Sequence, residues 1–174
     1  TDVCKFEKQI DVKFFLSYYY YGGIVYLMQK DLERACYFFE VVVTTPAWSV
    51  SSIMAEAYKK FIISSLLMYG KVIALPKFTS PIVASTLKPM ARLYNDIATA
   101  FSSSSLAELK KTIELNASLI QRDNNKEIVD SLISIFVRKN IQKLTKTFLT
   151  LSLADVASRV ELDSPAEAAS FILQ

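Results

Sequence analysis

The sequence predicts an all-α protein in which helical repeats lead into the front half of a winged helix. Helix-start signals recur near residues 12, 31, 50, 80, 89, 106, 125, 140, 152 and 164, and this spacing leaves almost no room for a sheet. Apolar residues make up 52% of the chain, which is enough for a sizeable core. We therefore expect a helical-repeat part over residues 1–137 and a winged-helix subdomain, without its wing strands, over residues 138–174.

The stretch 19–46 follows the tetratricopeptide repeat pattern, in which small residues allow two antiparallel helices to cross closely. Gly23 and Ala35 are the small residues here, Asp31 is placed to cap the second helix, and Pro46 stands one residue early for the closing proline. The aromatic positions of the pattern hold Tyr19, Tyr26 and Phe39. The match predicts a helical hairpin. Because only one copy matches well, the array of tetratricopeptide-like repeats is inferred from it.

Aromatic residues around this hairpin are expected to pack between helices. The four adjacent tyrosines of Tyr18–Tyr21 point round the whole helix, so some of them must face a neighbouring helix or a partner. A platform for stacking nucleobases is not favoured, because no basic residue is interleaved with them. Trp48 is expected to pack at the hairpin junction, ahead of a long helix over Ser49–Tyr69 that ends at Gly70.

Prolines and polar clusters divide the next part of the chain into shorter helices. Pro81 is expected to start one helix, and Pro89 to open the next. Residues 102–105 are four consecutive serines, which predict an exposed loop, and the last of them begins a capping box and a helix to about residue 120. The polar run 123–125 is expected to cap a helix that ends at about residue 137.

The stretch 139–173 predicts helix, short strand, helix, turn and helix, which is the order of a winged helix before its wing. Thr150–Ser152 is the expected strand, Ser152 and Asp155 form a capping box, and Ser164–Glu167 starts the third helix. The first helix has an apolar stripe of Ile141, Leu144 and Phe148. The second is expected to bury Leu153, Val156, Ala157 and Val160. A charge at position 153 should therefore destabilise the fold by a few kcal/mol.

The residue types argue against catalysis and against a membrane span. The chain has no His, and Cys4 and Cys36 stand alone, as expected for reduced thiols in an intracellular protein. The Gly22–Gly23 pair sits in a helix-packing pattern, so no phosphate-binding loop is present. The longest uncharged run, residues 14–29, is shorter than the roughly 20 residues that a span needs. We expect no enzyme activity, no metal and no cofactor.

The charge pattern bears on nucleic-acid binding. The net charge of +3 is too small to imply a polyanionic partner, and the third helix of the winged-helix stretch has no Lys or Arg. The preceding helix carries four basic residues without an acid among them: Arg138, Lys139, Lys143 and Lys146. We interpret these as a basic contact surface that faces solvent or a partner, with a weak nucleic-acid contact as the alternative.

Helical repeats that run into a winged helix resemble the PCI family, whose members occur in the proteasome lid, the COP-9 signalosome and an initiation-factor complex. Six segments closely resemble the signalosome subunit that is placed between subunits one and eight. They are FLSYYYYGG (Phe15–Gly23), TTPA (Thr44–Ala47), EAYKK (Glu56–Lys60), LPKFTS (Leu75–Ser80), RDNN (Arg122–Asn125) and KNIQKLTKTFLTLSLADVASRV (Lys139–Val160). The similarity is weak over Ser102–Leu119, and the family's wing strands and C-terminal helix do not appear before Gln174.

The resemblance implies a non-catalytic scaffold subunit of the signalosome, which removes the ubiquitin-like protein NEDD8 from cullins by means of a metalloprotease subunit elsewhere in the complex. It also implies hetero-oligomeric assembly with subunits one and eight as neighbours, no membrane, and a place in the cytoplasm and nucleus. By analogy with edge-strand addition between winged helices, Thr150, Leu151, Ser152 and Asp155 would lie near a partner. The alternatives are a PCI subunit of another assembly, such as the proteasome lid, and a nucleic-acid-binding PCI module.

Overall fold

The computed structural model describes residues 12–103, 105–148, 152–162 and 164–173, and these residues form ten α-helices. No strand occurs among the described residues, which confirms the all-α prediction. The helices are α1 (Val12–Met28), α2 (Leu32–Thr44), α3 (Ser52–Tyr69), α4 (Pro81–Met90), α5 (Arg92–Ser102), α6 (Leu106–Leu115), α7 (Ala117–Arg122), α8 (Lys126–Thr147), α9 (Leu153–Arg159) and α10 (Pro165–Leu173).

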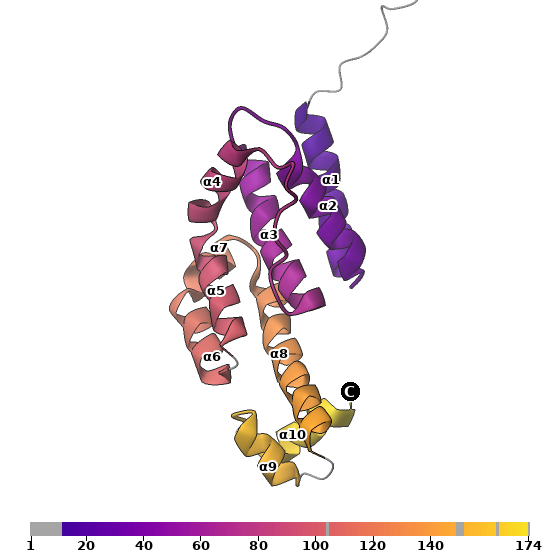
Figure 1. Cartoon of the computed structure of the whole chain (residues 1–174), viewed down its shortest axis with the longest axis vertical. Helices are drawn as coiled ribbons and strands as arrows, with labels where there is room; N and C mark the ends of the chain where they lie inside the picture. Colours follow the sequence, from indigo (N-terminus) through magenta and orange to yellow (C-terminus); the bar gives the residue numbers. More distant parts are fainter. Residues whose placement is uncertain (1–11, 104, 149–151, 163, 174) are drawn as a thin grey trace, which may run out of the picture.

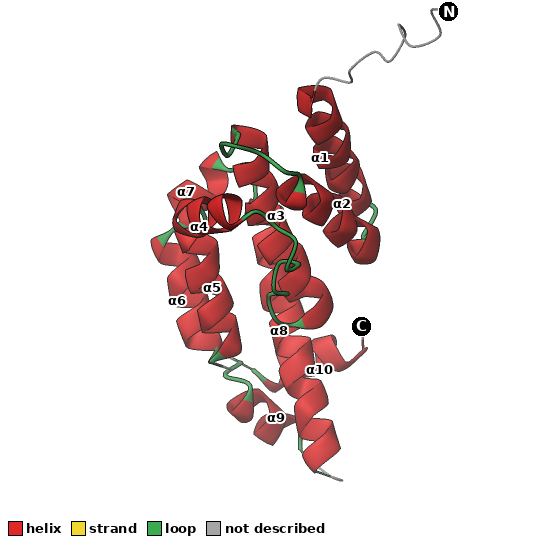
Figure 2. Ribbon diagram, turned by 45° about the horizontal axis from the view of Figure 1, so that its top comes forward, coloured by secondary structure: helices red, strands yellow, loops and turns green. Residues whose placement is uncertain are grey.

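Helix α3 lies at the centre of the molecule. Figure 1 shows α1 and α2 on one side of it, the shorter helices α4 to α7 on the other, and α8 running from α3 to the far end, where α9 and α10 lie. The same order is visible in the tilted view of Figure 2. Most of α3 is buried, from Met54 to Leu67 on several faces, because neighbours contact it from both sides.

The antiparallel hairpin of α1 and α2 has the packing that the repeat pattern predicts. A Cβ atom on Gly23 would lie 2.7 Å from Cε1 of Phe39, and one on Gly22 would lie 2.6 Å from Cε1 of Phe38, so only glycine allows this approach. Ala35 and Phe39 are fully buried. The Asp31 carboxylate caps α2 by accepting the Arg34 N–H at 3.2 Å, as expected.

One expectation about the aromatic residues needs correction, and another is confirmed. Trp48 does not pack at the hairpin junction: 97% of its surface is exposed, because the smaller side chains of Ala47 and Val50 pack against the core there instead. The tyrosine run is divided between two environments. Tyr19 and Tyr20 turn towards the rings of α2, whereas Tyr18 and Tyr21 remain exposed.

After α3, helices α4, α6 and α8 begin close to the predicted capping signals, but the start expected at Pro89 and the expected helix ends are wrong. Pro89 lies in the last turn of α4 and does not open α5, because the Ala91 N–H still reaches the Leu87 carbonyl and the helix continues through the proline. The single helix expected up to about residue 120 divides at Asn116 into α6 and α7. The side-chain amide of Asn116 donates to the Thr112 carbonyl at 2.9 Å at the point where α6 ends.

The prediction that a helix ends near Val137 is wrong, because α8 is one continuous helix of 22 residues. No Gly or Pro interrupts it, and Val137 and Ile141 are buried on the same face on either side of the expected break. The proposed boundary between residues 137 and 138 therefore falls inside a helix. In the predicted strand, Thr150 and Leu151 lie outside the described residues.

The buried face of α9 is shorter than expected. Val156, Ala157 and Val160 are buried in the core, as predicted, but Leu153 has 46% of its surface exposed. Leu153 is the first residue of α9, where the helix has not yet reached the core. A charge at this position therefore does not enter a buried environment, and the destabilisation expected from the sequence is not supported.

Candidate functional site

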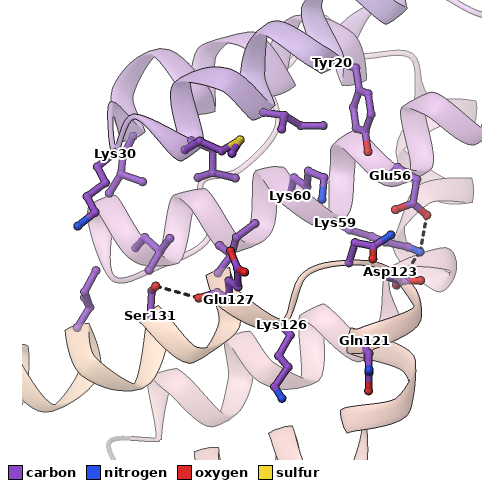
Figure 3. A pocket seen from close by; sticks show the side chains of 18 of the residues that line it. Tyr20, Lys30, Glu56, Lys59, Lys60, Gln121, Asp123, Lys126, Glu127 and Ser131 are labelled. Atoms are coloured by element: carbon purple, nitrogen blue, oxygen red, sulfur yellow. Dashed lines mark hydrogen bonds and ion pairs between the residues drawn. The ribbon is translucent and has the colours of Figure 1, made fainter.

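A groove of about 1320 Å³ runs between α1, α3 and the chain from α7 into α8. Figure 3 shows that its side chains come from all three directions, with Tyr20 on α1, Lys59 and Lys60 on α3, and Asp123 just after α7. Its aliphatic wall consists of Ile24, Leu27, Met28, Leu32, Leu67, Ile128 and Ile135. Its titratable side chains, apart from tyrosines, are Lys30, Glu56, Lys59, Lys60, Arg122, Asp123, Lys126, Glu127 and Arg138.

At one end of the groove, a carboxylate of α3 and one that follows α7 share one lysine. Lys59 Nζ donates to Glu56 Oε1 at 2.7 Å and to Asp123 Oδ2 at 2.9 Å. The Lys59 and Asp123 side chains are 12% and 9% exposed, so solvent screens this ion pair only weakly. It joins two of the sequence segments that carry the family resemblance, EAYKK and RDNN.

A second chain of hydrogen bonds runs beside the ion pair and is buried. Lys60 Nζ donates to Asn125 Oδ1 at 2.5 Å, and Asn125 Nδ2 donates to the Tyr94 hydroxyl at 2.8 Å. The Tyr94 hydroxyl in turn donates to Asp123 Oδ2 at 2.9 Å. These contacts connect α3, α5 and the start of α8, so the polar cluster fixes how three helices are placed relative to one another.

Burial and pairing shift the pKa values of these groups in different directions. Burial alone would lower the pKa of Lys59 and raise that of Asp123, but their hydrogen bond and the contacts from Glu56 and Tyr94 outweigh burial, so the pKa of Lys59 is raised and that of Asp123 is lowered. Lys60 bonds an amide, not a carboxylate, and its burial lowers its pKa. Burial and the nearby Glu56 raise the pKa of Tyr20 to about 12.

The sequence did not predict this cluster. Asp123 and Asn125 were expected to act as helix caps, yet Asn125 makes no side-chain capping bond and instead bonds Lys60 and Tyr94. Polar residues before a helix are usually caps. Asn125 differs from an ordinary cap residue because it is fully buried. Its burial depends on α3 and α5, which are distant in the sequence, so the local pattern does not reveal it.

The four basic residues of the predicted contact surface separate into two places. Arg138 lines the groove, whereas Lys139, Lys143 and Lys146 line a second hollow of about 400 Å³ with Tyr69 and Phe101. Among the described residues, no carboxylate lies within ion-pair distance of the three lysines. The surface predicted as one stripe therefore consists of a lysine cluster and one arginine that faces elsewhere.

The predicted partner contact is described only in part. Ser152 and Asp155 are exposed, and Ser152 caps α9 as expected by accepting the Asp155 N–H at 3.1 Å. The Asp155 carboxylate accepts the Ser152 hydroxyl at 2.6 Å. Thr150 and Leu151 lie outside the described residues. Cys36 is a buried free thiol, and its burial raises its pKa to about 11, whereas Cys4 is not among the described residues.

Over the described part of the chain, no group of three or more His, Cys, Asp or Glu side chains is placed to hold a metal ion. None of the described helices combines the length and the hydropathy that crossing a bilayer requires. The polar cluster can hold the helices in register. The groove can offer a mixed apolar and charged surface to another polypeptide.

Comparison with known proteins matches this architecture. The family model of the N-terminal helical repeats of COP9 signalosome complex subunit 3 matches residues 1–83. The subunit 3 protein of Drosophila melanogaster is 48% identical over 163 residues, which cover 94% of this chain. The chain belongs to the COP9 signalosome subunit 3 family. The resemblance to the signalosome branch of the PCI family that the six motifs predicted is thus confirmed.

The subunit 3 family extends well beyond this chain. The chain covers 36% of the Drosophila protein and 40% of the Dictyostelium discoideum subunit 3, to which it is 35% identical over 168 residues. The model of subunit 3 helical repeats covers α1, α2, α3 and the start of α4, which include Lys59 and Lys60. The match to the Drosophila protein covers 94% of this chain and so continues beyond the part that the family model matches.

Proposed function

We propose that this chain is part of a non-catalytic scaffold subunit of the COP9 signalosome. The observation that carries the proposal is its 48% identity to the Drosophila subunit 3 over 94% of the chain. As the motif resemblance implies, the complex removes NEDD8 from cullins in a metalloprotease subunit, so this chain contributes contacts between proteins and no chemistry. We further propose, on the same resemblance, that the protein resides in the cytoplasm and nucleus.

An exposed face of α1 supports a role in assembly. Its large apolar side chains recur at spacings of four and three residues, and each has more than half of its surface exposed: Phe14, Tyr18, Tyr21, Val25 and Met28. Terminal units of repeat arrays normally carry a polar outer face. An apolar row of this length instead suits a surface that another helix covers.

The C-terminal part supports the proposed winged-helix contact. Helices α8, α9 and α10 follow one another in the order expected for the front half of a winged helix, and α9 begins at the predicted capping box. We place the contact with subunits one and eight at Ser152 and Asp155, together with Thr150 and Leu151. Ser152 and Asp155 are both exposed and therefore accessible to a partner.

Reconstitution of the full-length protein with subunits one and eight tests this contact. Changing Ser152 and Asp155 to Arg should reduce the recovered partners severalfold. The Glu114→Arg variant, at another exposed position on α6, should leave recovery unchanged. Circular dichroism should show that both variants keep their helix content. Full recovery with the Ser152 and Asp155 variant would contradict the placement of the contact.

The lysine cluster favours one alternative function, a nucleic-acid contact. Lys143 and Lys146 are exposed, and no described carboxylate pairs with them. If they contact phosphates, changing both to Glu should weaken binding of a labelled RNA at low salt and flatten its salt dependence. Arg138→Glu is the matched control, because Arg138 lines the other hollow. Absence of RNA binding by the unmodified protein at low salt would exclude this alternative.

A further inference from the structure

The Glu161 carboxylate joins the end of α9 to the start of α6 through hydrogen bonds. Glu161, which follows α9, accepts the Ala107 N–H at Oε2 with a distance of 2.9 Å. The Ser105 hydroxyl, 56 residues away in sequence, lies 3.3 Å from Oε2 and 3.5 Å from Oε1. The same hydroxyl accepts the Glu108 N–H at 3.3 Å, so Ser105 both caps α6 and holds Glu161.

The backbone at Glu161 indicates that its side chain is used. Glu161 has a φ of 59°, the left-handed conformation that glycine usually supplies at the end of a helix. The Leu162 N–H reaches back to the Ala157 carbonyl at 2.9 Å, which is the bond pattern of such a helix end. A glutamate in this conformation strains the backbone. The hydrogen bonds of its side chain to Ser105 and Ala107 offset that strain.

Ser105 closes the run of serines between α5 and α6, a segment that the proposed function leaves without a role. We propose that Ser105 is a phosphorylation site, and that its phosphate displaces Glu161 and so uncouples α9 and α10 from α6. A protein kinase would supply the group from ATP. The Ser105 Oγ–P bond forms, the bond from the γ-phosphorus to ADP breaks, and the hydroxyl proton passes to the base of the kinase.

Electrostatic repulsion determines whether the phosphate or the Glu161 carboxylate stays at the N-terminus of α6. Phosphorylation removes the hydroxyl proton that Ser105 donates to Glu161 and adds a charge of about −1.5 to −2 beside a carboxylate that now lies within hydrogen-bond distance. The phosphate oxygens can accept the N–H groups of the first turn of α6, where a negative charge is favoured. Helix α6 therefore stays capped, while Glu161 is repelled and loses its contact with Ala107.

Hydrogen–deuterium exchange on the full chain with phosphoserine encoded at position 105 tests the displacement. Amides of α9 and of Leu162 should exchange roughly three- to tenfold faster, the change that loss of one hydrogen bond produces. The first-turn amides of α6 should remain as slow as in the unmodified chain. Ser105→Ala is the matched variant, because it removes the Ser105 cap and its bond to Glu161 but leaves the bond from the Ala107 N–H to Glu161. Exchange should therefore rise in the first turn of α6, and should rise less at α9 than in the phosphorylated chain.

Two results would overturn the proposal. One is unchanged exchange at α9 in the chain with phosphoserine at 105, because Glu161 would then not have been displaced. The other concerns occupancy in cells. The full-length protein, purified from its own cells with phosphatase inhibitors, should carry phosphate on Ser105, as peptide mass spectrometry can show. Phosphate confined to Ser102, Ser103 or Ser104, or absent from peptides that cover all four serines, would exclude Ser105 as the modified residue.

Discussion

Gly70 ends α3 in the left-handed conformation, with a φ of 72°, and its amide N–H bonds the Leu66 carbonyl. An added Cβ atom would lie 2.5 Å from Lys139 Nζ, and the backbone conformation itself disfavours any side chain that is not glycine or asparagine. We expect Gly70→Ala to lower the free energy of unfolding by about 1–2 kcal/mol. Urea denaturation measures this free energy of unfolding. Gly70→Asn is the control, and its free energy of unfolding should fall clearly less. Equal losses would contradict the backbone explanation.

Leu153 and Val156 lie three residues apart on α9 but differ in burial, with exposed fractions of 46% and 6%. Val156→Asp buries an unpaired carboxylate and should cost about 3 kcal/mol or more. Leu153→Asp places the charge in the exposed first turn of a helix, where it is favoured, and should cost about 1 kcal/mol or less. Thermal unfolding of the two variants checks this. Comparable destabilisation would mean that α9 presents a different face to the core.

At the scale of the helices, the polar cluster around Asp123 makes the packing of α3 against α5 and α8 depend on pH. Hydrogen bonds from Lys59 and Tyr94 outweigh burial and hold the pKa of Asp123 below its usual 3.8. A carboxyl whose pKa is lower in the folded state adds stability above pH 3.8, and this contribution is lost as the pH falls through the folded-state pKa. The native packing should therefore weaken in acid through this group.

The Asp123→Asn variant isolates that contribution. At pH 7 it should be about 2–3 kcal/mol less stable than the unmodified chain, because Lys59 loses a charged partner. The difference should shrink below pH 3.8, where the carboxyl itself becomes protonated. Urea titrations at a series of pH values measure this. A difference that stays constant across the series would show that the ionised carboxylate is not what stabilises the cluster.

Several helix starts could be predicted from the sequence because their signals are local. The caps at Asp31, Ser105 and Ser152 each act within three residues, and each accepts the N–H that the spacing predicts. Helix ends and polar contacts between helices were harder to predict from the sequence. The continuity of α8 through Val137 depends on buried neighbours, and the roles of Asp123 and Asn125 depend on Lys59, Lys60 and Tyr94 from distant helices. Contacts with residues that are distant in the sequence leave no local sequence pattern from which they could be predicted.

For the whole molecule, the class and the family followed from the sequence, whereas the arrangement of charges did not. The spacing of Gly23, Ala35 and Phe39 was enough to predict the hairpin, because helix crossing has strict size limits. The basic stripe was expected to be continuous, since Arg138 and Lys139 are neighbours in sequence. Adjacent residues on a helix point about 100° apart, and here that angle divides them between two hollows.

The central claim is that this chain belongs to a scaffold subunit of the signalosome. Affinity purification of the full-length protein from extracts of its own cells at moderate salt, with mass spectrometry of the proteins that stay bound, tests it most directly. We expect the other signalosome subunits in near-equal amounts, with subunits one and eight among them. Recovery of proteasome-lid subunits instead, or of proteins that nuclease treatment removes, would contradict the claim and leave a correct fold in a different assembly.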